Sequence, residues 1–207
     1  MCVNFTPIKK ERLKAPTGVE LDDYPSEAYP GYQAPMIVLD ESAQTRVELA
    51  VFGLIPHWAK DRSFAKRTYN ARSETVAEKP SYRQAWKRRQ FCLIPMERFY
   101  EPNWTSGKAV RWAIERQDHE PFSVAGIWDR WTDKTSGEVV QSFSMLTINA
   151  DGHPIMGQFH KPGDEKRSLV IVPPSSRKDW LSATADNAFD LMRELPTQEF
   201  TSRADPK

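Results

Sequence analysis

Six short runs of β-branched and aromatic residues between residues 91 and 172 constrain the fold more than any other feature. Such runs have the length and composition of β-strands. They lie at residues 91–94, 98–100, 110–115, 122–131, 139–148 and 169–172, and two earlier runs lie at 36–39 and 47–52. The segment 132–138 contains Asp133 and Gly137, which suit a hairpin turn. The sequence therefore predicts strands that follow one another as antiparallel hairpins.

Helices are expected to be few and short. Sixteen prolines favour short elements joined by stiff turns over a helical bundle. We expect one helix from Ser81 through Trp86, one from Ser175 or Ser176 through Leu181, and one at 188–195 that Pro196 stops. A parallel βαβ fold requires more helical crossovers than these. The predicted fold class is α+β, with a curved, largely antiparallel, barrel-like sheet flanked by a few short helices.

Length and composition predict one globular domain. The chain has 207 residues, 39% of them apolar and 28% charged, which is typical neither of a membrane protein nor of a disordered chain. We expect the domain over residues 1–195 and a frayed polar tail over 196–207. Two cysteines, Cys2 and Cys92, cannot form a disulfide framework. A monomer in the reducing cytoplasm is expected, with no membrane partner.

The net charge of +1 conceals a basic segment at residues 60–89. This segment has ten lysines and arginines against three acidic residues, and Arg72 and Arg83 are among them. Trp58, Tyr69 and other aromatic residues are interleaved with these charges. Positive charge attracts phosphates and flat rings stack on bases, so the pattern is typical of a nucleic-acid groove. The alternative is a solvated helix face with core aromatics behind it.

Cys2 is the most unusual candidate for chemistry. If Met1 is removed, this residue carries a thiol and a free α-amine, whose pKa of about 7.7–8.0 leaves part of it neutral at physiological pH. A neutral amine condenses with an aldehyde, and the thiol then closes a five-membered thiazolidine ring. Cys2 could instead be an N-terminal nucleophile that attacks an amide. With Met1 retained, the residue would be incidental.

Three further side chains are candidates from their surroundings. Asn70 lies within the basic segment and could hold a reacting oxygen or a sugar. Glu101 follows an aromatic pair at the end of a predicted strand, where desolvation would raise its pKa and make it a general acid. His160 precedes the last of the six runs. No motif for a metal, a phosphate-binding loop or a dinucleotide is present, so no cofactor and no metal are expected.

Several segments in order resemble the SRAP family, the SOS-response-associated peptidases, whose members shield abasic sites in single-stranded DNA. The matching segments are Met1-Cys2, 70–75 (NARSET), 92–95 (CLIP), 99–101 (FYE), 124–128 (VAGIW), 142–147 (SFSMLT) and His160. They extend from the first residue to about Trp180. Several motifs in register are more specific than any one of them.

The resemblance implies a role for each matching residue. Cys2 would form the covalent link to the ring-opened abasic aldehyde, and Asn70 would position the sugar. Glu101 would transfer protons during imine formation, and His160 would assist ring opening and slow reversal. Other matching positions would hold the DNA backbone or flank the lesion; they are Arg72, Thr147 and Trp58.

The chain also departs from the family's pattern. Val3 and Asn4 stand where the family commonly has Gly and Arg, and Pro102 stands where it has Trp. The loss of that arginine removes a phosphate contact. The family also commonly has an arginine soon after the histidine, and Lys161 or Arg167 is expected to replace that cation. These departures bear on DNA geometry and affinity more than on the crosslink.

The sequence thus predicts a protein of the DNA damage response that binds single-stranded DNA and crosslinks to abasic sites through Cys2. Two alternatives remain open. One is a cysteine-type peptidase in which Cys2 attacks an amide, with Met1–Cys2 as its smallest possible substrate. The other is a nucleic-acid-binding module without catalysis. As a crosslinking protein or as a nucleic-acid-binding module, the protein would associate with the nucleoid while it is bound to DNA.

Overall fold

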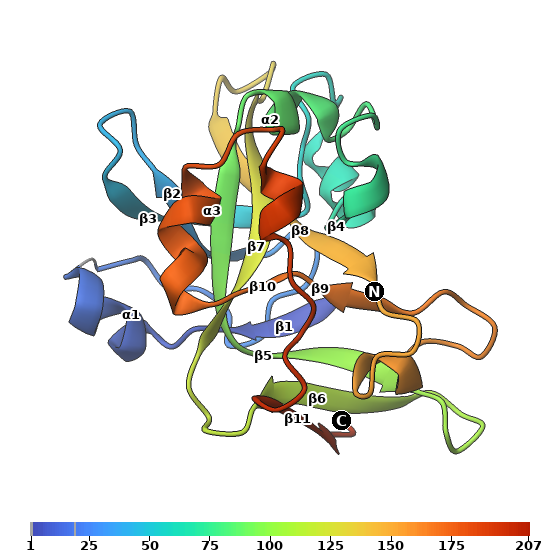
Figure 1. Cartoon of the computed structure of the whole chain (residues 1–207). Helices are drawn as coiled ribbons and strands as arrows, with labels where there is room; N and C mark the ends of the chain where they lie inside the picture. Colours follow the sequence, from blue (N-terminus) through green and yellow to red (C-terminus); the bar gives the residue numbers. More distant parts are fainter. Residues whose placement is uncertain (1, 19) are drawn as a thin grey trace.

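A computed structural model describes residues 2–18 and 20–207. Figure 1 shows strands wrapped around one another, with short helices at the periphery. The strands are β1 (Asn4–Pro7), β2 (Gln33–Leu39), β3 (Thr45–Phe52), β4 (Asn70–Arg72), β5 (Phe91–Asn103), β6 (Val110–Arg116), β7 (Phe122–Thr132), β8 (Val139–Asn149), β9 (Arg167–Leu169), β10 (Ile171–Val172) and β11 (Phe200–Ala204). The α-helices are α1 (Lys10–Thr17), α2 (Arg83–Lys87) and α3 (Arg177–Leu181). Short 3-10 helices occur at Arg62–Arg67, Ser73–Thr75, Met156–Gln158, Pro174–Ser176 and Ala188–Leu191.

Five strands close a barrel. In the described part of the chain, β7, β8, β3, β2 and β5 are hydrogen-bonded in that order, and β5 pairs with β7 to complete the ring. All of these pairings are antiparallel except that of β3 with β8. The predicted α+β class with a barrel-like, largely antiparallel sheet is therefore confirmed.

Strand β5 is long because its two halves pair with two different strands. Its first half, Phe91 to Met96, pairs with β7, and its second half, Arg98 to Asn103, pairs with β6. The sequence predicts two strands here, separated by Pro95. The structure has one continuous strand. Pro95 keeps its place opposite Ser123 of β7, although proline has no N–H to donate to the sheet.

Aromatic side chains fill the barrel. The rings of Phe52 and Phe143 stack with centroids 5.5 Å apart, and Phe5 meets Phe52 edge to face at 5.2 Å. A second apolar layer lies outside the barrel, where Trp180 of α3 donates a hydrogen bond to the carbonyl of Cys92 at 2.9 Å. Cys92 is fully buried, as its apolar surroundings in the sequence indicate, and burial raises its pKa.

One glycine permits two strands to approach closely. A Cβ atom on Gly126 of β7 would lie 2.8 Å from the backbone oxygen of Ser144 in β8 and 2.9 Å from Sγ of Cys92 in β5. Because the backbone oxygen cannot move aside as a side-chain end can, the close approach of β7 to β8 favours glycine at this position.

Three sequence expectations near the C-terminus are wrong. The helix expected at 188–195 is only a 3-10 turn, Ala188–Leu191. The run at 169–172 is divided between β9 and β10, which pair with β8 and β7. The tail expected at 196–207 contains β11, which pairs with β6 and buries Phe200. Long-range pairing orders this segment despite its polar composition. No helix in the described residues is long and apolar enough to span a membrane.

Candidate active site

The pairing of β1 with β5 fixes the position of Cys2. Asn4 faces Tyr100 and Phe5 faces Phe99 in antiparallel register, so the chain just before β1 runs beside the end of β5 that carries Glu101. The Cys2 thiol is buried and donates a hydrogen bond to the backbone carbonyl of Asn4 at 3.3 Å. Burial and the negative charge of Glu101 raise the thiol's pKa far above its usual range. Cys2 is therefore held as a neutral thiol.

Glu101 combines burial with a carboxyl group that titrates near neutrality. The residue lies in β5 opposite Trp112 of β6, with only 3% of its surface exposed. Burial raises its pKa from 4.5 to about 7. The side chain thus holds a proton in about half of the molecules at neutral pH, which suits a group that both donates and accepts a proton.

His160 lies next to Glu101. Its Nε2 is 3.5 Å from Oε2 of Glu101, and its backbone N–H donates to the carbonyl of Pro102 at 3.1 Å. Burial and nearby positive charge, including Lys166, lower the pKa of the imidazole to about 4, so the ring is neutral at pH 7. Neither ring nitrogen has a hydrogen-bond partner within residues 2–18 and 20–207.

The backbone of His160 is in the left-handed region, with φ of 64°. A non-glycine residue there costs about 1–3 kcal/mol and persists only where its surroundings enforce it. The hydrogen bond to Pro102 and the bridge between Asn103 and Phe159 enforce it here. Pro102, which departs from the family's pattern, thus supplies the carbonyl that holds His160 beside Glu101.

Asn70 presents an unsatisfied acceptor. It opens β4, which pairs in parallel with β8, and it is 9% exposed. The Asn70 Nδ2 donates to the carbonyl of Tyr69 at 3.1 Å. The backbone carbonyl of Asn70 accepts a hydrogen bond from the Tyr82 hydroxyl at 2.9 Å. Its buried Oδ1 has no partner among the described residues. Buried polar atoms are nearly always hydrogen-bonded, so this oxygen is available to a ligand's hydroxyl group.

Tyr69 connects these side chains, and the sequence analysis gave it no role of its own. It is half-buried, and burial together with the charges of Cys2 and Glu101 raises its pKa. Its ring packs against the core cluster that contains Cys2. Its position directly before Asn70 is the only sequence signal that could have singled it out.

A small basic cavity adjoins Asn70. Its volume is about 300 Å³, and its lining includes Asn70, Arg67, Arg72, Lys79 and Tyr82. Three cations around an unsatisfied polar atom can hold a phosphate and the sugar attached to it.

Arg167 and Thr147, two residues predicted to contact DNA, are instead buried beside one another. Arg167 is 2% exposed; its guanidinium contacts Glu74 at 2.8 Å and Glu165 at 2.7 Å. It also donates to the backbone and hydroxyl oxygens of Thr147, at 2.7 and 3.1 Å. Five hydrogen bonds occupy the two terminal nitrogens of this guanidinium, so it supports the sheet edge at β4 and β8 rather than lying on the surface. Arg72 is half-exposed and meets Glu165 at 2.8 Å.

The remaining predicted contacts lie on the surface. Trp58 is 46% exposed and packs edge to face on Phe64 at 5.0 Å. Arg83 at the start of α2 and Lys161 after His160 are both exposed. Asn4 is buried, and its Nδ2 donates a hydrogen bond to Glu27. DNA binding by Trp58, Arg83 and Lys161 stays a prediction.

Fold and site define a class: a small β-barrel protein whose second residue is a buried cysteine beside a Glu–His pair. The family profile described as SOS response associated peptidase (SRAP) matches residues 1–204. This chain therefore belongs to the SRAP family, as the sequence motifs predict.

Named relatives and solved structures agree with this assignment. The chain is 28% identical over 162 residues to the abasic site processing protein YoqW of Bacillus subtilis, covering 75% of this chain and 68% of the relative. It is 26% identical over 120 residues to the abasic site processing protein HMCES of Gallus gallus, covering 48% of this chain and 36% of that protein. A crystal structure from Bordetella bronchiseptica is 32% identical, covers both chains fully and superposes with a TM-score of 0.90.

Proposed function

We propose that this chain binds single-stranded DNA and forms a covalent thiazolidine between Cys2 and a ring-opened abasic site. The observation that carries the proposal is the placement of the Cys2 thiol beside a carboxyl group that titrates near pH 7. The relatives named abasic site processing proteins give the substrate class. A protein with this function acts where DNA is, which favours the cytoplasm and nucleoid.

The reaction begins once hydrolysis has removed Met1 and freed the Cys2 amine. The neutral amine attacks the aldehyde carbon of the opened sugar and gives a carbinolamine. Glu101 donates a proton to its hydroxyl group, which leaves as water, and the resulting iminium returns its N–H proton to the Glu101 carboxylate, so that a neutral imine remains. The thiol then adds to the imine carbon while its proton moves through Glu101 to the nitrogen. One water is released overall, and the aldehyde is no longer available for β-elimination.

The other residues position the substrate in this proposal. The free Oδ1 of Asn70 accepts a hydrogen bond from a sugar hydroxyl group. Neutral His160, 3.5 Å from Glu101, accepts or returns the proton that opens the sugar ring. Arg67, Arg72 and Lys79 line the adjacent cavity and attract the flanking phosphates.

The decisive experiment compares an abasic with an intact single-stranded oligonucleotide on a denaturing gel. We expect a shifted band with the abasic strand only, and none with Cys2→Ser, whose hydroxyl does not close a stable ring. Intact mass of the wild-type protein should show loss of Met1. A shifted band that persists in Cys2→Ser would contradict the proposed linkage.

The family's name favours peptide-bond hydrolysis as a second candidate function. Its smallest form is removal of Met1, which the proposed crosslink itself requires. Expression of Glu101→Gln and mass analysis of its N-terminus test this form. Retention of Met1 in the variant, with loss in the wild type, would assign that cleavage to the site. Cleavage of unrelated peptides without DNA would favour a general peptidase.

A further inference from the structure

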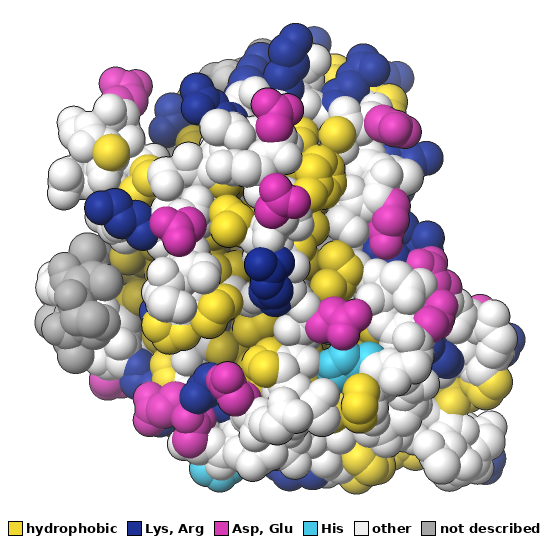
Figure 2. Space-filling view, in the orientation of Figure 1, with side chains coloured by type: hydrophobic (Ala, Val, Ile, Leu, Met, Phe, Trp, Pro, Cys, Tyr) yellow, Lys and Arg dark blue, Asp and Glu magenta, His cyan; other side chains and the backbone are white. Residues whose placement is uncertain are grey.

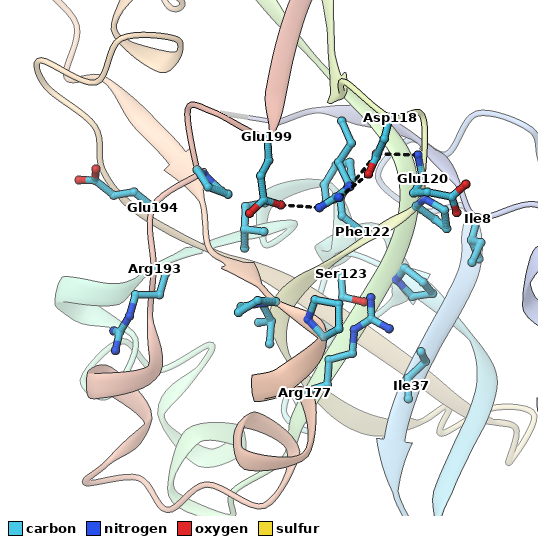
Figure 3. A pocket seen from close by; sticks show the side chains of 18 of the residues that line it. Ile8, Ile37, Asp118, Glu120, Phe122, Ser123, Arg177, Arg193, Glu194 and Glu199 are labelled. Atoms are coloured by element: carbon cyan, nitrogen blue, oxygen red, sulfur yellow. Dashed lines mark hydrogen bonds and ion pairs between the residues drawn. The ribbon is translucent and has the colours of Figure 1, made fainter. Parts of the chain in front are cut away.

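A large cavity near the surface is separate from the candidate active site. It has a volume of about 1160 Å³, and Cys2, Asn70, Glu101 and His160 are not among its lining residues. Figure 2 shows hydrophobic side chains among charged ones on the face that carries α3 and β10, and Figure 3 shows the cavity from close by. Pockets of this size hold small organic ligands.

The cavity wall is mostly apolar. Ile37 of β2, Phe122 of β7 and Ile171 of β10 form its floor together with Met192. Five of the lining residues are prolines: Pro95, Pro121, Pro173, Pro174 and Pro196. Because proline has no N–H, this wall offers few backbone donors to the carbonyl groups of a bound peptide. An aliphatic chain, which needs no such donors, suits it better.

Most of the charged groups at the cavity already have partners. Arg116 contacts Asp118 and Glu199, both at 2.5 Å, as the dashed lines in Figure 3 mark. Arg12 lies 3.7 Å from Glu120 and also donates to a backbone carbonyl. These pairs neutralise one another at the rim.

Arg177, the first residue of α3, is the exception. It is half-buried, and its Nε has no hydrogen-bond partner in the described part of the chain. Burial and the positive charge of Arg116 lower its pKa. In Figure 3 its side chain extends toward Ser123. A half-buried cation without a partner is costly, and a carboxylate would remove that cost through two parallel hydrogen bonds.

We propose that this cavity binds a small aliphatic carboxylate, with its hydrocarbon chain against Ile37, Ile171 and Met192 and its head group paired with Arg177. The site is independent of the DNA chemistry proposed above. Its ligand class follows from an apolar wall and from the half-buried Arg177, which has no acidic partner among the described residues.

Titration with decanoate, followed by methyl NMR, tests the proposal. We expect the methyl signals of Ile37, Ile171 and Met192 to shift with decanoate and much less with decyltrimethylammonium, which has the same chain and the opposite charge. Arg177→Met keeps the length of the side chain and should weaken decanoate binding at least about tenfold. Arg130→Met is the control, because Arg130 is an exposed arginine that lies over Trp128 and is absent from the cavity lining.

The wild-type comparison decides the matter even if Arg177→Met fails to fold. Equal shifts with both amphiphiles, or shifts confined to other methyl groups, would overturn the proposal. So would a folded Arg177→Met variant that binds decanoate as the wild type does.

Discussion

Glu101 and His160 face one another with the usual order of their pKa values reversed. Oε2 of Glu101 lies 3.5 Å from Nε2 of His160, yet the pKa of the carboxyl is raised to about 7 and that of the imidazole is lowered to about 4. Burial is the leading cause of both shifts, because it disfavours the charged form of each group. The proton of the pair therefore resides on the carboxyl, and the site at neutral pH holds an acid beside a neutral base.

The rate of crosslinking should depend on pH with a bell-shaped profile. The amine must be neutral, so the rate rises toward its pKa of about 7.7–8.0. Glu101 must carry a proton to release water, so the rate falls above its pKa of about 7. We expect a maximum between these values in initial rates measured on denaturing gels.

Glu101→Gln should lower that rate by about 10²–10⁴-fold, the usual contribution of general acid–base catalysis. The falling limb should disappear in this variant, since glutamine does not titrate. Binding of the intact oligonucleotide is the control and should change little. An unchanged falling limb in Glu101→Gln would assign it to another group.

The same substitution should stabilise the fold in alkaline solution. A carboxyl whose folded pKa is raised binds its proton more tightly when folded. Its contribution to stability is therefore present below its unfolded pKa of 4.5 and is lost as the pH rises through about 7. The rise in the pKa of Glu101 corresponds to at most about 3 kcal/mol of stability. Urea unfolding of Glu101→Gln should show a gain over the wild type at about pH 8 and little gain at about pH 4. An equal difference at both values would mean that Glu101 is not buried as a neutral acid.

Asn70→Ala should separate catalysis from folding. Its Oδ1 has no partner among the described residues, so its loss should change the free energy of unfolding by less than about 1 kcal/mol. The crosslinking rate should fall at least about tenfold if this oxygen holds the sugar, as one lost hydrogen bond in the transition state predicts. Ser73→Ala is a matched control on the neighbouring turn. Comparable losses of rate in both variants would argue against a specific role.

The sequence predicted strands β6, β7 and β8 well because their pattern is local. The expected runs at 110–115, 122–131 and 139–148 differ from β6, β7 and β8 by no more than one residue at each end. Strand β11 was missed because its five residues look polar and pair with β6 from more than eighty positions away in the chain. Such pairing depends on tertiary contacts that override local propensity.

The residues of the candidate site were named from the family's motifs, and their roles stay predictions; only part of the site's electrostatics could be predicted from the sequence. A raised pKa of Glu101 follows from its aromatic neighbours, whereas the lowered pKa of His160 depends on packing against residues far apart in sequence. The burial of Arg167 was also not predictable, since Glu74 lies 93 positions earlier. A basic residue in a motif does not reveal whether it faces solvent or another side chain.

Arg167 and Arg72 should therefore respond differently to substitution. Arg167→Ala removes the buried donor of Glu74 and of the Thr147 hydroxyl, while Glu165 keeps its contact with Arg72. Because both carboxylates are partly exposed, the expected loss of stability is about 1–3 kcal/mol. Arg72→Ala breaks one half-exposed pair, worth at most about 1 kcal/mol. It should weaken binding of single-stranded DNA and reduce the slope of log affinity against log salt by about 0.7, the value for one phosphate contact on a single strand. Urea unfolding and salt titrations of both variants check this. A folded, stable Arg167→Ala with a reduced salt slope would instead place Arg167 in contact with DNA.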